Sequence, residues 1–200
     1  MSSFAPSTIL IIGATGFIGK YITNAILDAA PAFQKVIVIT SEASASSKKE
    51  LLSSWQVKGV QVITGDITKE ADITAAYTGV DTVISCLGRG GLEHQFKLID
   101  LAEATDNIKW FFPSEYGTDI EYSAESAHEK PHQVKLRIRK HIRENVKRIK
   151  YTYLVTGPYA EAWFRLADSS PEAGGFDVAK RKAVVIDDGD GRVGLTTMPE

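Results

Sequence analysis

The chain has 200 residues, of which 44% are hydrophobic and 24% charged, as expected for an ordinary globular protein with a sizeable core. Its net charge of -2 argues against a polyanion-binding protein, so we expect no nucleic-acid partner. The single cysteine cannot form an internal disulfide and no apolar run approaches membrane-spanning length, so we expect a cytoplasmic protein with no membrane partner.

The first apolar run, residues 9–12, leads directly into three glycines and then into an amphipathic segment. Gly13, Gly16 and Gly19 have G-x-x-G-x-x-G spacing. In a dinucleotide site such glycines allow a tight turn, a close approach of the pyrophosphate and close packing of helix on sheet. The free N–H groups of the helix then face the phosphates. This turn, with Thr15, Phe17 and Ile18, is the candidate pyrophosphate site; a turn without a ligand is the alternative.

Short apolar runs alternate with helical patterns along the rest of the chain. The runs are rich in β-branched and aromatic residues and apolar on both faces, as buried parallel strands are. The expected strands are 9–12, 36–39, 60–63, 82–86, 108–112 and 151–155, and the expected helices are 17–30, 48–55, 71–77, 92–104 and 134–149. We therefore expect a doubly wound α/β fold with a parallel, Rossmann-like sheet. The small polar segment 41–47 is expected to be a loop.

The end of the second strand bears on the choice of coenzyme. NAD-specific sites usually carry a carboxylate there, whereas this chain has Thr40 and Ser41, with Lys48 further along. Small hydroxyls would tolerate a 2′-phosphate and a lysine could pair with it, so we favour NADP(H) over NAD(H). The alternative for Lys48 is a solvated residue at a helix start. Asp66, which follows the third strand, either accepts a hydrogen bond from the adenine amine or caps its own turn.

The usual short-chain dehydrogenase pair, a tyrosine with a lysine four residues later, is absent from this sequence. The chain offers instead the segment FFPSEYG at 111–117 and a long helix opened by Pro131, His132 and Lys135. Lys135 is expected at the edge of the apolar stripe of that helix, with Arg139 one turn further on. The alternative for Lys135 is a surface lysine that happens to start the helix. A free lysine has a pKa of about 10.4, so it serves as an acid at neutral pH without a shift and as a base only after a fall of roughly three units. His132 is a second candidate proton carrier, or a residue that merely starts the helix.

GATGFIG, the GDI turn, FFPSEYG, the lysine helix and the segment YTYLVTGPYAEAWF together resemble the isoflavone reductase-like branch of the NmrA-like family, which are atypical short-chain dehydrogenase/reductases. The resemblance implies an NADP(H) site with Lys135 as general acid/base, and a small aromatic or conjugated, phenylpropanoid-like substrate. It also implies that Ser114 and Glu115 flank the nicotinamide and that Cys86, Leu87 and Gly88 line the coenzyme ribose. Gly157, Pro158 and Tyr159 would form the coenzyme end of the substrate pocket, and Ile67 of the GDI turn is a further candidate coenzyme residue beside Asp66.

The resemblance divides the chain into a dinucleotide-binding domain, 1–156, and the start of a C-terminal substrate region, 157–200. Relatives carry an arginine where Thr40 and Ser41 stand, and a phenylalanine in place of Tyr116. They also have further helices beyond the position of residue 200, so this substrate region is expected to be incomplete.

Segments 184–186 and 195–197 are expected to pair through an Asp-Gly-rich turn. An oligomer is compatible with the sequence, and no metal site is expected. The alternative to a reductase is a non-catalytic NAD(P)-binding redox sensor of the NmrA type.

Overall fold

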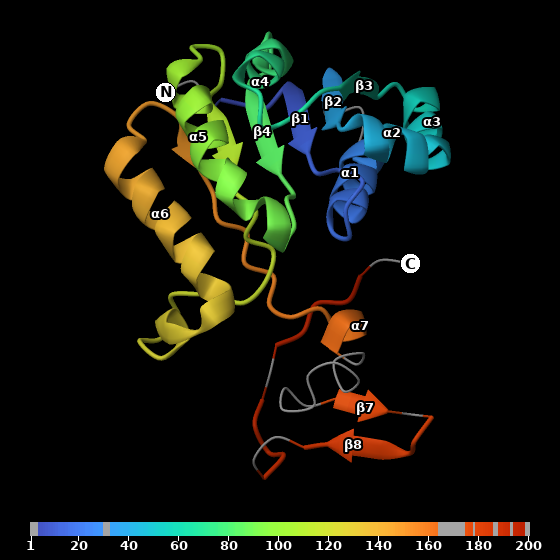
Figure 1. Cartoon of the computed structure of the whole chain (residues 1–200), viewed down its shortest axis with the longest axis vertical. Helices are drawn as coiled ribbons and strands as arrows, with labels where there is room; N and C mark the ends of the chain where they lie inside the picture. The colour runs from blue at the N-terminus through green and yellow to red at the C-terminus, as the bar shows by residue number, and fades with distance from the viewer. Residues whose placement is uncertain are drawn as a thin grey trace. The chain divides into compact units, whose positions relative to one another are not determined.

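Six parallel strands form one sheet in the order β3-β2-β1-β4-β5-β6 (Figure 1). The computed structural model describes residues 4–29, 33–163, 175–177, 179–185, 188–192 and 194–198. The strands are β1 (Thr8–Ile12), β2 (Lys35–Thr40), β3 (Gln61–Thr64), β4 (Thr82–Ser85), β5 (Trp110–Phe112) and β6 (Lys150–Tyr151). The strand order reverses between β1 and β4, which is the place where open α/β sheets bind ligands. The predicted doubly wound, Rossmann-like sheet is confirmed.

The register aligns the carboxyl ends of the three central strands. Ile12, the last residue of β1, stands opposite Ile39 of β2 and Ser85 of β4. The loops that follow these strands therefore emerge side by side at one edge of the sheet.

Helices connect the strands close to the predicted ranges, but the helix predicted at 134–149 ends at Asn145, the first part of the helix predicted at 92–104 is a 3-10 turn, and one segment predicted as a loop is helical. They are α1 (Gly19–Asp28), α2 (Glu42–Ser47), α3 (Lys49–Val57), α4 (Glu70–Tyr77), α5 (Gln95–Ala104), α6 (Gln133–Asn145) and α7 (Ala160–Trp163), with 3-10 turns η1 (Arg89–His94), η2 (Ser126–His128) and η3 (Lys130–His132). That last segment is 41–47, where the predicted loop is wrong. Ser41 caps helix α2, because its Oγ accepts a hydrogen bond from Ser44 N at 3.2 Å.

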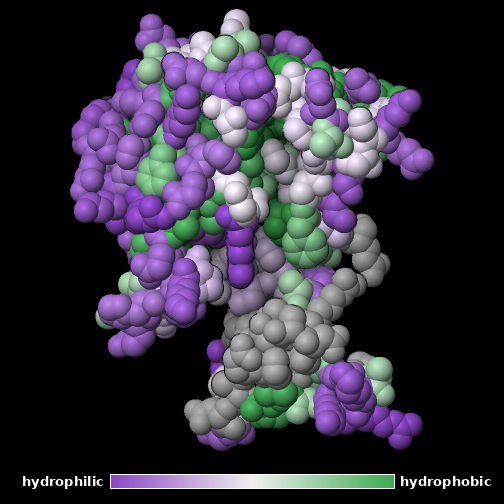
Figure 2. Space-filling model, in the orientation of Figure 1, coloured by the Kyte–Doolittle hydropathy of each residue, from purple (hydrophilic) through white to green (hydrophobic). Residues whose placement is uncertain are grey.

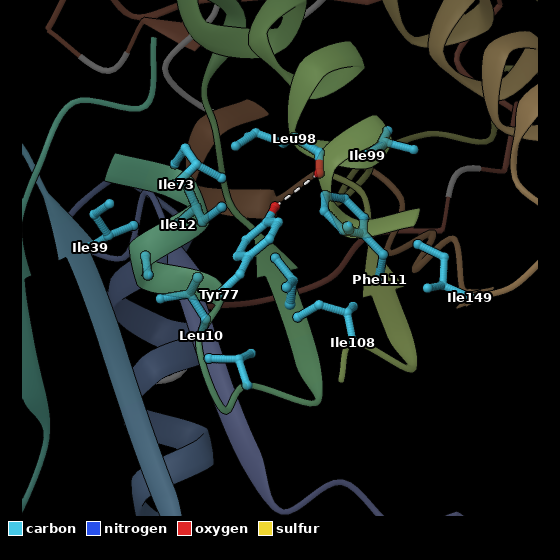
Figure 3. Packing of buried hydrophobic residues seen from close by; sticks show 14 of the residues in the cluster. Leu10, Ile12, Ile39, Ile73, Tyr77, Leu98, Ile99, Ile108, Phe111 and Ile149 are labelled. Carbon is cyan, nitrogen blue, oxygen red and sulfur yellow. Dashed lines mark hydrogen bonds between the residues drawn. The ribbon is translucent and has the colours of Figure 1, made fainter. Parts of the chain in front are cut away.

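Helices α4, α5 and α6 pack on one face of the sheet and enclose an apolar core cluster (Figure 3). This face carries the β-strand side chains of Leu10, Ile12, Ile39 and Phe111. Tyr77 is buried within the cluster, and its Oη donates to the carbonyl of Leu98 at 2.9 Å. The polar end of the ring is thus satisfied, and burial raises the pKa of Tyr77.

Helices α1 and α3 contribute no residue to that cluster. They belong to the crossovers on the other side of the strand reversal, and right-handed crossovers there place helices on the opposite face of the sheet. They are joined by Trp55, which is 1% exposed and whose Nε1 donates to Asn24 Oδ1 at 2.8 Å. Trp55 therefore serves to pack α3 against α1.

The outer surface of α6 is strongly hydrophilic (Figure 2). Glu121, from the acidic segment before the helix, binds Arg139 at 3.0 Å and Arg143 at 2.9 Å. The hydrogen bond from Arg143, followed by that from Arg139, lowers the pKa of Glu121. Arg139 is buried, and its guanidinium lies 4.6 Å from the centre of the Tyr153 ring. The positive charge of the helix is therefore partly neutralised by this acidic residue.

The chain divides into two compact units, and the second comprises Glu115–Asp119 and Leu154–Glu200. Within this unit β7 (Gly175–Asp177) pairs antiparallel with β8 (Lys182–Val184). Thr196 instead forms a parallel bridge with Tyr159. The predicted pairing of 184–186 with 195–197 is therefore wrong for the described residues, since β8 takes its partner from the chain before it; Ile186 lies outside them. Among the helices that the structure describes, none is long and apolar enough to cross a membrane.

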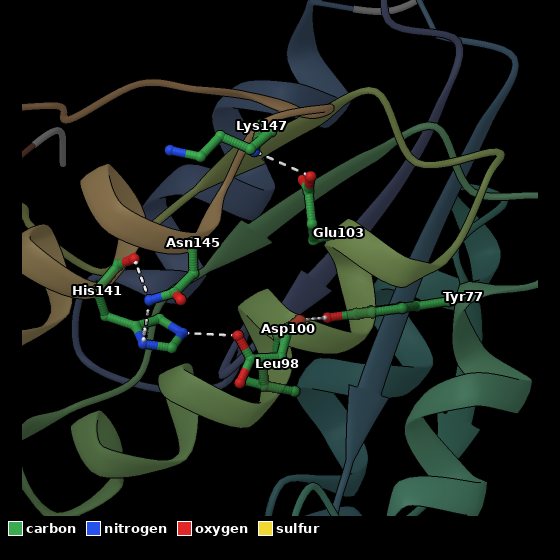
Figure 4. Close-up of polar contacts among 7 residues, drawn as sticks. All are labelled: Tyr77, Leu98, Asp100, Glu103, His141, Asn145 and Lys147. Atoms are coloured by element: carbon green, nitrogen blue, oxygen red, sulfur yellow. Dashed lines mark hydrogen bonds and ion pairs between the residues drawn. The ribbon is translucent and has the colours of Figure 1, made fainter.

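Two side chains link the end of α5 to the segment after α6. The Arg148 guanidinium donates to backbone carbonyls at the end of α5, among them Ala102 at 2.5 Å and Thr105 at 2.7 Å. In the opposite direction, the Glu103 carboxylate accepts hydrogen bonds from the backbone N–H groups of Lys147, Arg148 and Ile149 at 2.9, 2.6 and 3.1 Å. Figure 4 shows the contact with Lys147. Partial burial alone would raise the pKa of Glu103, but the three N–H donors together outweigh burial and lower it.

We predict that Glu103→Gln lowers the free energy of unfolding at pH 7 by about 1–2 kcal/mol, because charge-assisted hydrogen bonds to backbone are lost. A carboxyl with a lowered folded-state pKa stabilises the fold above its ordinary pKa of 4.5, and this contribution is lost as the pH falls through the lowered value. The difference between variant and wild type should therefore shrink below about pH 4. Urea denaturation at several pH values measures it, with the exposed Glu144→Gln as control. An equal loss in both variants would contradict the assignment.

Candidate functional site

The turn between β1 and α1 is packed too closely for side chains at two of its glycines. Gly13 has a φ of +78°, and a Cβ there would lie 2.7 Å from the carbonyl oxygen of Cys86. A Cβ on Gly19 would lie 2.2 Å from the carbonyl oxygen of Gly13. At Gly16 the nearest atom to a Cβ is the same Gly13 oxygen, at 3.1 Å. The turn thus has the tight bend and the close helix packing that the sequence predicts for a dinucleotide site.

At the end of this turn, the backbone N–H groups of Phe17, Ile18 and Gly19 have no acceptor in the described part of the chain. They stand at the beginning of the ten-residue helix α1, whose dipole adds positive potential. Phe17 itself is 57% exposed and leaves the backbone accessible. An anion such as a pyrophosphate would satisfy these groups.

Beside this turn lies a cavity of about 190 Å³ at the carboxyl ends of β1, β2 and β3. It is lined by side chains and backbone of Ile12, Gly13, Thr15, Ile39, Thr40, Ser41, Ser44, Gly65, Asp66, Ile67 and Leu87. Seven predicted coenzyme residues meet here: Gly13, Thr15, Thr40, Ser41, Asp66, Ile67 and Leu87. The wall combines apolar side chains with small hydroxyls and one carboxylate, a composition that suits an adenosine group.

Asp66 has the capping role that the sequence allowed. Its Oδ1 accepts hydrogen bonds from the Thr68 hydroxyl at 2.7 Å and from Thr68 N at 2.9 Å. These bonds, the hydroxyl's first, lower the pKa of Asp66. The carboxylate is thereby held in a fixed orientation at the cavity wall, where its remaining capacity can accept a further donor.

The loops after β4 and β5 are tied to each other and to the glycine turn. Cys86 is buried and its N–H donates to the carbonyl of Ile12 at 2.7 Å. Ser114 Oγ donates to the carbonyl of Leu87 at 2.7 Å, and Ser114 N donates to Gln95 Oε1 at 2.7 Å. Gly88 begins the turn into η1. These loops continue the carboxyl edge of the sheet from β1 toward β5.

Lys135 lies in the first turn of α6 and is half-buried. Arg139, one turn further along, is buried and pairs with Glu121. The side chain of His132 is held by η2, since its Nδ1 lies 2.8 Å from the carbonyl oxygen of Ser126. This contact supports the alternative interpretation of His132, as a residue that organises the start of the helix.

The structure does not bring all predicted residues to the cavity. Lys48 is exposed between α2 and α3 and does not line it. Glu115 and Gly157 to Tyr159 belong to the second unit, where Gly157 has a φ of +74° and its N–H donates to the carbonyl of Gly117. Tyr159 Oη accepts a hydrogen bond from the Thr156 hydroxyl at 3.0 Å. No cluster of potential metal ligands occurs among the described residues.

The sequence did not predict two residues of this region, Ser44 at the cavity and Gln95 beside Ser114. Ser44 lines the cavity because segment 41–47 is helical, and the Ser41-x-x-Ser44 capping pattern was the available signal. Gln95 was missed because it stands among the apolar residues of α5. Its spacing from Leu98 and Ile99 places it on the buried stripe of that helix.

Residues 5–169 match the model of the NmrA-like family. The chain belongs to this family. It is 35% identical over 191 residues to the phenylcoumaran benzylic ether reductase PT1 of Pinus taeda, covering 94% of this chain and 59% of that protein. It is 31% identical over 200 residues to the isoflavone reductase of Pisum sativum, covering 94% and 61%.

Solved structures of the same kind share the fold. A crystal structure of isoflavone reductase matches with a TM-score of 0.69 and 31% identity, covering 83% of this chain and 54% of that one. The binary complex of leucoanthocyanidin reductase with NADPH from Vitis vinifera matches with a TM-score of 0.67 and 26% identity, covering 77% and 51%. This NmrA-like chain therefore spans little more than half the length of its relatives.

We predict that Gly19→Ala destabilises the protein by about 2–3 kcal/mol, because the added methyl would overlap backbone atoms that cannot move independently. Gly90→Ala is the matched control, since a Cβ at Gly90 meets nothing within 4 Å. Thermal and urea denaturation of both variants measure the effect. Equal stability of the two would show that the turn is looser than this geometry.

Proposed function

We propose that this NmrA-like chain binds NADP(H) at the carboxyl edge of its sheet and belongs to a reductase of small aromatic or conjugated, phenylpropanoid-like substrates. The observation that carries the proposal is the glycine turn, with its uncommitted N–H groups, directly beside the hydroxyl-lined cavity. The relatives support it, since they are named as reductases and one is solved with NADPH. We further propose a cytoplasmic location.

The residues present fit such a coenzyme. The cavity beside β2 and β3 would hold the adenosine half, and the start of α1 would hold the pyrophosphate. Thr40 and Ser41, with Ser44, present no carboxylate that would repel a 2′-phosphate. A dinucleotide straddles the strand reversal, so its nicotinamide half would extend toward the loops after β4 and β5 that hold Leu87 and Ser114.

The chemistry divides between coenzyme and protein. When bound, NADPH supplies a hydride to the substrate. Lys135 Nζ would then deliver a proton to the anion that develops, which is the role of a general acid. The buried Arg139 is fixed by Glu121 one turn behind Lys135 and keeps this end of α6 in place. Residues 157–200 would begin the substrate-binding region, with Gly157, Pro158 and Tyr159 beside Glu115.

The test is NADPH oxidation with a panel of phenylpropanoid acceptors, comparing wild type, Lys135→Ala and Lys140→Ala. Lys140 is a matched control because it lies on the same helix, exposed and paired only loosely with Glu144 at 3.8 Å. We expect Lys135→Ala to lower kcat by about 10²–10⁴-fold, the usual contribution of a positioned general acid. Lys140→Ala should retain wild-type kcat, and both variants should bind NADPH.

Equal turnover by Lys135→Ala and wild type would remove this lysine from the mechanism. Tight NADPH binding by the wild type without turnover of any acceptor would favour the redox-sensor alternative over the reductase.

A further inference from the structure

Gln95 is a completely buried polar residue near the carboxyl edge of the sheet. It is the first residue of α5 and shares that helix's buried stripe with Leu98, Ile99 and Ala102. Glutamine is mostly an exposed residue, and one that is 0% exposed needs hydrogen bonds to offset the loss of water.

Only one end of the Gln95 amide meets that need. Oε1 accepts from the backbone N–H of Ser114 at 2.7 Å, whereas Nε2 has no hydrogen-bond partner among the described residues. One bond gained and one donor left buried contribute little net stability. An amide at this position is therefore poorly explained by the stability of the fold alone, since an apolar side chain would suit its surroundings better.

The bond that Gln95 does make lies at a junction of three segments. Ser114, which Gln95 holds by its N–H, donates through its own hydroxyl to the carbonyl of Leu87. Leu87 lines the cavity, and its neighbour Cys86 contacts Ile12 and approaches Gly13. A continuous set of contacts thus runs from Gln95 through the loops after β5 and β4 to the glycine turn.

We propose that Gln95 is a positioning residue for the nicotinamide half of the coenzyme. It acts through Ser114 and Leu87, whose loops it holds in register at the carboxyl ends of β5 and β4. This inference rests on the proposed function and adds a residue to it. Neither Gln95 nor Ser114 lines the adenosine cavity, whereas Leu87, which accepts a hydrogen bond from Ser114, does. The two halves of the site should therefore respond differently to the loss of Gln95.

The test uses two probes, NADPH and 2′,5′-ADP, which lacks the nicotinamide half. Gln95→Leu removes the acceptor for Ser114 N at similar volume. We expect it to weaken NADPH binding and to lower kcat by about tenfold each, the scale of one lost buried hydrogen bond, while 2′,5′-ADP binding changes less than about twofold. Gln95→Glu keeps an acceptor oxygen and should recover most of both. Gln56→Leu, at an exposed glutamine of α3, is the control and should match wild type.

If Gln95→Leu does not fold, Gln95→Asn carries the same expectation, because it withdraws the acceptor by one methylene and keeps the amide. The assignment is overturned if the folded variants bind NADPH as wild type does, or if they lose NADPH and 2′,5′-ADP equally, as a general structural role would require. Absence of NADPH binding by the wild type would instead overturn the proposed function together with this inference.

Discussion

The close packing between the first crossover and the loop after β4 constrains the rest of the site. Neither Gly13 nor Gly19 has room for a Cβ, because the carbonyl oxygens of Cys86 and of Gly13 itself occupy that space. This packing brings the start of α1, whose first N–H groups have no acceptor among the described residues, close to the strand ends at the point where the strand order reverses. The cavity, the positions of Thr15 and Leu87, and the contacts of Ser114 all follow from that arrangement.

The sheet could be predicted from the sequence because buried parallel strands are apolar on both faces and leave a strong local signal. The positions at which the strands end could be predicted less well. The sixth strand ends at Tyr151 and not at Val155. The apolar residues up to Val155 predicted a longer strand, but the pairing with β5 does not continue beyond Tyr151, and Val155 is 42% exposed. The loop predicted for 41–47 is wrong for a different reason. Its serines indicated a loop, but alanine favours a helix and Ser41 caps the start of that helix.

The site was predicted unevenly. Turn glycines and strand-end residues follow from topology, which is why Gly13, Thr40 and Asp66 meet at one cavity. The direction in which a side chain points does not follow from topology. Lys48 was as good a candidate coenzyme residue in the sequence as Thr40, yet it is exposed and does not line that cavity. Gln95 carried no recognisable motif, because its role depends on Ser114, a partner 19 positions away in the sequence. Pairings of that kind require the folded arrangement.

Hydrogen–deuterium exchange with and without NADPH tests the central claim most directly. If the amides at the start of α1 hold the pyrophosphate, peptides spanning residues 13–20 should be strongly protected by NADPH, while peptides from the exposed segment around Val57 remain unchanged. Unchanged exchange in residues 13–20 at a saturating NADPH concentration would contradict the account.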